Sequence, residues 1–223
     1  MRWFRILKSK IRNLFTRKSG PKAKVSNKTY ILPQELRDEY LRNWNRAKIN
    51  EHHKTSVQRG LDKVKPHVEE YEVVANHIAC SIHALICSHY REASCDFDRQ
   101  ILNGQDWDRR TTIVPKGEGP FENFEVSCKR GFAIKPKMES LTNIVDLLHF
   151  LERWNGWGYR RRGIWSPYLW SYTNLYTKGY YTSDGRYSSR AVNKQLGCAS
   201  LLKALFEEYN LTTDDKGEII PKS

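Results

Sequence analysis

Apolar residues recur every three or four positions along most of this chain, which is the spacing of amphipathic helices. The first such run covers residues 33–49 and has Pro33 near its start, where a helix tolerates proline because its first N–H groups have no intrahelical partner. Its apolar stripe consists of Leu36, Tyr40 and Trp44. A second helical run covers residues 56–75, and we expect Pro66 to divide or kink it.

A third run, residues 77–90, is mostly apolar and predicts a buried helix. Its apolar face is formed by Ile78, Ile82, Leu85, Ile86 and His89. The run ends in the stretch SHYREASCDF, so Arg91 and Glu92 fall in the last turn, before small and polar residues break the pattern. Glu92 is therefore either a solvated residue at a frayed helix end or a group with a chemical role.

The pattern changes after this helix. Residues 93–119 are rich in turn formers and contain one β-branched run, residues 111–114, which predicts a small hairpin or an extended loop. Helical spacing returns at residues 121–132 and 141–154, and a last helix is expected within residues 191–209. The whole pattern predicts a mainly α (α+β) fold, a helical core with a small β-hairpin insertion.

The N-terminus has its own pattern, which predicts a basic amphipathic helix followed by a linker, together residues 1–24. Apolar residues at helical spacing include Trp3, Phe4, Leu7, Ile11, Leu14 and Phe15, and the basic side includes Arg2, Arg5, Lys8 and Arg12. Such a helix suits the surface of an anionic membrane, with contact through residues 1–18 and above all through Trp3, Phe4, Arg5, Lys8 and Arg12. The alternative is a helix docked on the domain with its basic side in water.

Charge and cysteine content limit the function classes. The net charge is +13, but residues 1–24 hold nine Lys or Arg and no acid, so residues 25–223 carry only +4. We therefore do not expect a nucleic-acid-binding domain. The five cysteines are odd in number and none forms a CxxC pair, which favours free thiols in a reducing compartment. No apolar run reaches about 18 residues and no signal peptide is evident, so we expect synthesis as a soluble, monomeric cytoplasmic protein.

Glu92 has the position of a general acid. The C-terminal end of a helix carries partial negative charge, which disfavours a carboxylate and raises its pKa, and aromatic surroundings would raise it further. A carboxyl group that stays protonated near neutral pH can protonate a leaving-group oxygen. Arg91 opposes this shift unless it points away or is paired.

The segment 154–187 holds four of the seven tryptophans and seven of the twelve tyrosines. Flat rings with a polar tip suit a groove that holds sugar rings or bases, and they also suit packing of the last helix onto the core. We expect about half of them to be core residues.

The sequence offers weaker signals for a metal site and for a cysteine nucleophile. Cys80, His83 and Cys87 share one face of the expected helix, with His77 one turn earlier, but a single straight helix rarely surrounds a tetrahedral ion. Cys95 lies near His89 in sequence, without an identifiable third group to orient the pair. We expect no metal and no cofactor.

Three longer stretches carry a family resemblance. The run IHALICSHYREASCDF…LNGQDWDRRTTIVPKGEGPFENFEVSC resembles phage endolysin-like proteins of the lysozyme superfamily, in which a helix ends in an RES signature followed by an NG loop and an RT…VP…GPF segment. LERWNGWGY and SPYLWSYTNLYTKGYYTSDGRY are similar to later motifs of that group. The resemblance covers about residues 70–210, within a lysozyme-like catalytic domain expected over residues 25–223.

The resemblance implies that Glu92 is the catalytic acid and that peptidoglycan is the substrate, cut between N-acetylmuramic acid and N-acetylglucosamine. The expected sugar-contacting residues are Asn103, Gln105, Thr111, Trp157, Tyr159, Tyr168, Trp170 and Tyr172. Such a protein is made in the host cytoplasm and acts on the cell wall or in the periplasm, or it travels with the virion.

Departures from the family pattern leave the second carboxylate open. Ala93 stands where the group commonly has Ser, Gln105 stands where it often has Asp, and the phage-lysozyme spacing of Glu, Asp and Thr places Ile101 and Trp107 at its second and third positions. The near candidates are Asp98, Asp106 and Asp108, and Asp184 is a distant one.

Alternatives remain open for both the reaction mechanism and the class of function. A retaining glycosidase needs carboxyl groups about 5–5.5 Å apart and an inverting one about 6.5–9.5 Å. With Glu92 as both acid and base, the muramic 6-hydroxyl would attack internally, as in lytic transglycosylases. Hydrolysis is our first expectation and transglycosylation our second. A glycan-binding but non-catalytic lysozyme-like virion or scaffold protein is the third.

Overall fold

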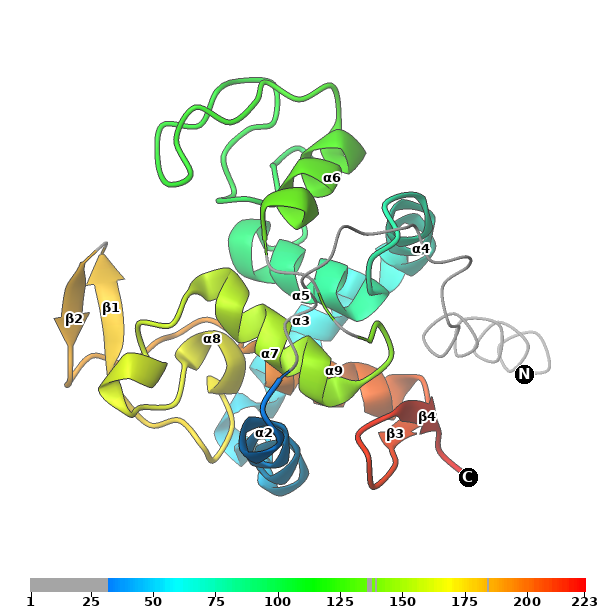
Figure 1. The fold of residues 1–223 in the computed structure, drawn as a ribbon, viewed down its shortest axis with the longest axis vertical. Coiled ribbons are helices and arrows are strands. Elements are labelled where there is room, and N and C mark those ends of the chain that lie inside the picture. Colours follow the sequence, from blue (N-terminus) through cyan, green and yellow to red (C-terminus); the bar gives the residue numbers. More distant parts are fainter. Residues whose placement is uncertain (1–31, 136–137, 139, 184) are drawn as a thin grey trace.

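A computed structural model describes residues 32–135, 138, 140–183 and 185–223 of the chain (Figure 1). In this part the fold is mainly helical with two small antiparallel hairpins, so the expected α+β class is confirmed. The expected N-terminal helix and its proposed membrane contacts lie outside the described residues, and so does Asp184. Those membrane contacts are Trp3, Phe4, Arg5, Lys8 and Arg12.

The first helices follow the apolar periodicity. Helix α2 (Gln34–Arg46) begins directly after Pro33, and a short 3-10 turn, η1 (Glu51–His53), leads into α3 (Lys54–Val64). The proline at position 66 lies in a second 3-10 turn, η2 (Lys65–His67), between α3 and α4 (Val68–His77). The predicted division of this region at Pro66 is therefore confirmed.

Helix α5 (Ile82–Ala93) begins five residues later than the apolar run at 77–90 predicted. Its predecessor α4 ends at His77, and Ala79 takes a left-handed conformation with φ of 53°. The Cys80 N–H then donates to the Ala75 carbonyl at 3.0 Å, which closes a tight turn. The apolar periodicity continues across residues 77–90 because both the turn and α5 pack apolar side chains. It therefore could not locate the boundary between the turn and the helix.

Helices α5 and α7 (Ile144–Asn155) occupy the centre of the molecule. Ten of the twelve residues of α7 are buried, so this helix is covered on all sides, as expected of a central helix. Around the pair lie α2, α8 (Pro167–Trp170) and α9 (Cys198–Glu208). One continuous hydrophobic core includes residues from Leu32 to Ile219.

The last helix is shorter than expected. Residues 191–197 are irregular, and α9 begins after Gly197, where a Cβ atom would lie 2.5 Å from the Leu169 carbonyl oxygen. A glycine is required at this contact because it lets the chain approach α8 closely. That close approach fixes the start of α9. The local spacing of apolar residues does not predict where this start lies.

Neither of the two hairpins includes residues 111–114, where the sequence predicted a hairpin or an extended loop. Strands β1 (Tyr180–Ser183) and β2 (Arg186–Ser188) form one hairpin, and β3 (Leu211–Thr213) and β4 (Ile219–Pro221) form the other. The β-branched run 111–114 is irregular, because the N–H groups of Thr112 and Ile113 donate to a side chain, that of Gln105, instead of a neighbouring strand. Of the two outcomes predicted for this run, the extended loop is the one found.

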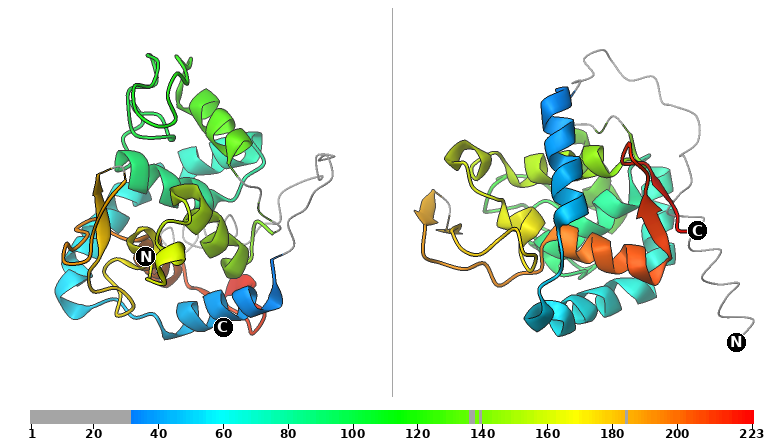
Figure 2. Two further views of the ribbon diagram at one scale, coloured as in Figure 1. Left: turned by 60° about the vertical axis from the view of Figure 1, so that its left-hand side comes forward. Right: turned by 90° about the horizontal axis from the view of Figure 1, so that it is seen from below.

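Figures 1 and 2 show how these parts are arranged. The loop of residues 97–121 and α6 (Phe124–Ile134) project from the helical body as a separate lobe, directly after the end of α5. In Figure 1 the β1–β2 hairpin protrudes to the left of the helical body and this loop lies above it. Within the described residues, no helix is long and apolar enough to cross a membrane.

Candidate active site

Glu92 lies in the last turn of α5, as the sequence predicted. The helix ends because Ser94 and Cys95 adopt left-handed conformations, with φ of 55° and 63°, and the Ser94 N–H donates to the Tyr90 carbonyl at 2.9 Å. Glu92 is half-buried, so it is not the frayed, solvated helix end that was the alternative.

Two aromatic donors hold one oxygen of this carboxyl group. The Trp154 indole N–H, from the end of α7, donates to Glu92 Oε1 at 3.2 Å, and the Tyr168 hydroxyl, from α8, donates to the same oxygen at 3.1 Å. Among the described residues, no donor binds Oε2. In the protonated carboxyl group Oε1 is thus the acceptor, and the acidic proton belongs on Oε2.

Burial raises the pKa of Glu92 above its usual range, which is the direction expected for a general acid. Arg91, the Tyr168 hydroxyl, Lys135 and the Trp154 N–H each lower this pKa, but burial outweighs them. Arg91 points elsewhere: it donates to the Leu196 carbonyl at 3.1 Å, and its guanidinium lies 4.7 Å from the centre of the Tyr168 ring. It opposes the shift through its charge, and this is the largest of the effects that lower the pKa of Glu92.

Gly104 attaches the projecting loop to the C-terminal end of α5. It has a φ of +71°, and a Cβ atom at this position would lie 2.1 Å from the carbonyl oxygen of Glu92. Its N–H donates to the Gln100 carbonyl at 3.1 Å. Only glycine satisfies both the conformation and the contact, so the NG pair of the sequence marks the point where loop and helix meet.

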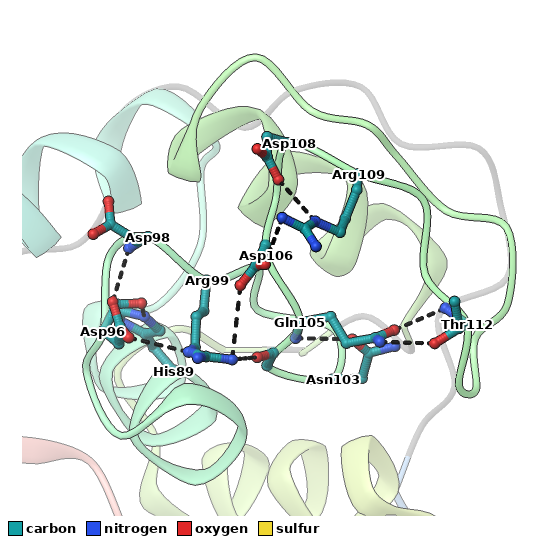
Figure 3. Close-up of polar contacts among 11 residues, drawn as sticks. His89, Asp96, Asp98, Arg99, Asn103, Gln105, Asp106, Asp108, Arg109 and Thr112 are labelled. Atoms are coloured by element: carbon teal, nitrogen blue, oxygen red, sulfur yellow. Dashed lines mark hydrogen bonds and ion pairs between the residues drawn. The ribbon is translucent and has the colours of Figure 1, made fainter.

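The predicted sugar contacts Asn103, Gln105 and Thr111 build the loop itself. Asn103 donates to the Ile113 carbonyl at 3.2 Å, and Gln105 exchanges two hydrogen bonds of 2.8 Å with Thr112, one to its hydroxyl and one from its N–H (Figure 3). The Thr111 side chain is buried and its hydroxyl donates to the Pro115 carbonyl. These side chains bond to other residues of the same loop and so fix its shape.

The three candidate aspartates lie on the same loop but in different surroundings (Figure 3). Asp106 contacts Arg109 at 3.1 Å and Arg99 at 3.8 Å, and Asp108 contacts Arg109 at 3.3 Å. Asp98 is exposed, and its side chain points away from the other two. Asp106 and Asp108 thus share one guanidinium.

His89, expected on the apolar face of this helix, fixes the turn that follows it. Its Nε2 donates to the Asp96 carbonyl at 2.9 Å, so its Nδ1 accepts from the Tyr71 hydroxyl at 2.7 Å. Burial lowers the pKa of His89 to about 4 and raises that of the nearby Cys95 thiol to about 11. Both groups are neutral at pH 7, which argues against a cysteine nucleophile here.

The remaining aromatic candidates divide between core and surface. Tyr159 and Trp170 are buried, while Trp157 and Tyr172 are half-buried. Tyr159 accepts from the Tyr181 N–H at 3.1 Å and so ties the β1–β2 hairpin to the body. Tyr172 stacks on His53, with ring centres 3.9 Å apart. The expectation that about half of this segment is core matches these positions.

Trp154 and Lys135 were not among the predicted site residues. Lys135 donates to the Trp154 carbonyl at 2.7 Å, and its ammonium lies 4.9 Å from the centre of the indole ring. The available signal was the position of Trp154 at the end of a helix, directly before an NG pair like the one at Gly104. The sequence prediction named the neighbouring Trp157, which contacts His149 and Arg160.

Within the described residues, no group of three or more His, Cys, Asp or Glu side chains could hold a metal ion. All five cysteines are free thiols. Comparison of the chain with protein-family models, with curated proteins and with solved structures gives no match.

Proposed function

We propose that this protein is a lysozyme-like glycosidase that cleaves peptidoglycan between N-acetylmuramic acid and N-acetylglucosamine, with Glu92 as the general acid. One observation carries the proposal: a half-buried carboxyl group with a raised pKa, held through a single oxygen by two aromatic donors. Oε2 then presents the proton to the glycosidic oxygen as the bond breaks.

The surroundings of Glu92 fit a polymeric sugar. Both the projecting loop and the β1–β2 hairpin protrude from the helical body (Figure 1), and in this proposal they contact the extended chain. On the hairpin, Tyr181 and Tyr187 flank Arg162, whose guanidinium lies 4.4 Å from the centre of the Tyr187 ring. Such partly exposed rings with polar edges suit stacking against sugars.

The test is Glu92→Gln, with the exposed Glu122→Gln as matched control. We expect the rate of clearing of purified cell walls to fall at least about a hundredfold in the first variant and to stay unchanged in the second. The Glu92 variant should be as stable as the wild type or more so at pH 7. The raised pKa means that folding disfavours the ionised Glu92 carboxylate. This cost to the stability of the folded protein is fully present above the folded-state pKa. The amide of the Glu92→Gln variant cannot ionise, so this variant does not carry the cost.

Full clearing by a folded Glu92→Gln protein would disprove the assignment of Glu92. Binding of the wild-type protein to peptidoglycan without release of reducing ends or anhydro ends would instead select the non-catalytic, glycan-binding class.

Lytic transglycosylation is the second candidate, and the pairing of two of the three loop aspartates favours it, the third being the exposed Asp98. Asp106 and Asp108 are both paired with Arg109, so neither is a free base in this arrangement. Glu92 would then also deprotonate the muramic 6-hydroxyl. Mass spectrometry of the products decides: hydrolysis adds one water per cut, and transglycosylation leaves 1,6-anhydro ends.

A further inference from the structure

A groove of about 720 Å³ lies away from the Glu92 group, between α2 and the segment before α8. Its lining consists of Glu39, Arg42, Asn43, Asn45, Arg46 and Trp165. None of these residues contacts Glu92 or belongs to the loop of residues 97–121. The size is that of a small-molecule site.

The groove is one face of α2. Glu39, Arg42 and Arg46 recur at helical spacing, and this face differs from the buried stripe that contains Tyr40 and Trp44. Both arginines are exposed. They therefore lie about one helical turn apart, with their side chains on the same side of the helix.

The charges in the groove are unequal. Glu39 accepts two hydrogen bonds from Arg160, at 3.0 and 3.2 Å, and shares this cation with Glu152, so part of its negative charge is offset. Within the described part of the chain, no carboxylate lies within 4.0 Å of Arg42 or Arg46. The groove thus presents two cations to an incoming ligand.

Trp165 supplies an apolar surface beside these cations. Its side chain is 36% exposed, and its ring meets the buried Trp170 edge-on, with centres 6.4 Å apart. The Arg46 guanidinium lies over the Trp165 ring, 5.4 Å from its centre, so a ligand would share the exposed indole with this cation. A fixed, partly exposed indole next to two guanidinium groups can hold a flat apolar face and an anion of the same ligand.

We propose that this groove is an accessory binding site for an acidic saccharide. The sugar ring lies against Trp165, and a carboxylate attached to the same sugar unit binds Arg42 and Arg46. Asn45, which is exposed in the lining, is placed to bind a hydroxyl or acetamido group. Identifying the ligand as a muramic acid unit of peptidoglycan rests on the proposed function. Its carboxylate would come from the lactyl group or from an attached peptide.

The experiment is calorimetric titration of the full-length Glu92→Gln protein, which cannot consume the ligand, with N-acetylmuramic acid, with N-acetylmuramyl dipeptide and with neutral N-acetylglucosamine. We expect the acidic sugars to bind more tightly than the neutral one by about tenfold. Tighter binding of the dipeptide than of N-acetylmuramic acid would assign the carboxylate to the peptide, and the reverse would assign it to the lactyl group.

Two further variants locate the site. Arg42→Ala with Arg46→Ala should weaken binding of the acidic sugars about tenfold, and Trp165→Ala should weaken binding of all three sugars. The matched control is Arg59→Ala with Lys63→Ala, which removes two exposed cations at the same spacing from α3. Equal binding by the groove variant and the control would overturn the proposal.

The result is independent of catalysis. In the background with an intact Glu92, the Arg42/Arg46 variant should cleave short soluble glycans at the wild-type rate and should bind intact cell walls less well in a sedimentation assay. If the wild-type protein cuts no glycan but the groove still discriminates acidic from neutral sugars, the proposed function fails and the binding site stands.

Discussion

At the scale of single residues, the Glu92 carboxyl group is placed by two donors that come from other helices. Both bind Oε1, and each stabilises the ionised form, whereas burial stabilises the neutral form. The balance keeps the pKa raised, but the donors limit how far it rises. A donor can therefore be removed to move the pKa in a known direction.

Tyr168→Phe should raise the pKa of Glu92 further because it deletes one hydrogen bond to the carboxylate. A general acid must be protonated, so activity falls as pH rises through its pKa. The alkaline limb of the pH profile of cell-wall clearing should move to higher pH, by less than about one pH unit. The matched control is Tyr176→Phe, because the buried Tyr176 hydroxyl donates to the Gly179 carbonyl and not to Glu92. A shift to lower pH, or the same shift in both variants, would contradict the role of Tyr168.

At the scale of structural elements, the projecting loop is held in shape by its own side chains and joined to α5 at Gly104. Gln105, which replaces the Asp often found in the resembling family, binds Thr112 and Ile113 and so closes the loop across its width. The loop exposes Ile113 and Val114, at 52% and 69% of their surface, on its outer part. Its position relative to Glu92 depends on the close backbone contact at Gly104, together with the buried Ile101 and the Arg130–Glu118 ion pair to α6.

Gly104→Ala should destabilise the protein by at least about 2 kcal/mol, because it combines a left-handed backbone with a Cβ that overlaps the Glu92 carbonyl oxygen. Cell-wall clearing should fall as well, since the loop has to move away from the acid. Gly117→Ala is the control: its φ is +80°, but no heavy atom lies within 4 Å of the added Cβ, so about 1 kcal/mol is expected. Urea unfolding measures both costs. Equal costs would show that the contact with Glu92 is unimportant.

At the scale of the whole molecule, a buried ionic network ties α2 to α7 and to the turn η3 (Arg160–Arg162). Glu152, in α7, accepts from Arg160 at 2.8 and 3.1 Å and from the Tyr40 hydroxyl of α2. Arg160 also binds Glu39 of α2 at 3.0 Å. These bonds hold α2 against α7, and the last turn of α7 contains Trp154, which donates to Glu92.

Arg160→Met should lower the free energy of unfolding by about 3 kcal/mol or more, because it leaves the buried Glu152 carboxylate without its cation. The exposed neighbour Arg161→Met should change it by less than about 0.5 kcal/mol. Urea unfolding at pH 7 gives both values. A cost for Arg160→Met no larger than that of its neighbour would mean that the network does not stabilise the fold.

The sequence by itself determined the features that depend on local spacing. Apolar periodicity located α2, the two helices separated at Pro66, and α7, because burial of one helical face repeats every three to four residues. It also placed Glu92 in the last turn of its helix, since the polar break after it is a local signal. It misplaced the start of that helix, where turn and helix share an apolar pattern.

Only the tertiary structure decided what surrounds Glu92. Trp154 and Tyr168 are separated from it by 62 and 76 residues, and helix packing alone brings their donors to one oxygen. The groove on α2 has the same origin, since Trp165 comes from a distant segment to meet Arg42 and Arg46. Spacing along the chain reports which face of a helix is buried, but the residue that meets that face is set by how the helices pack against one another.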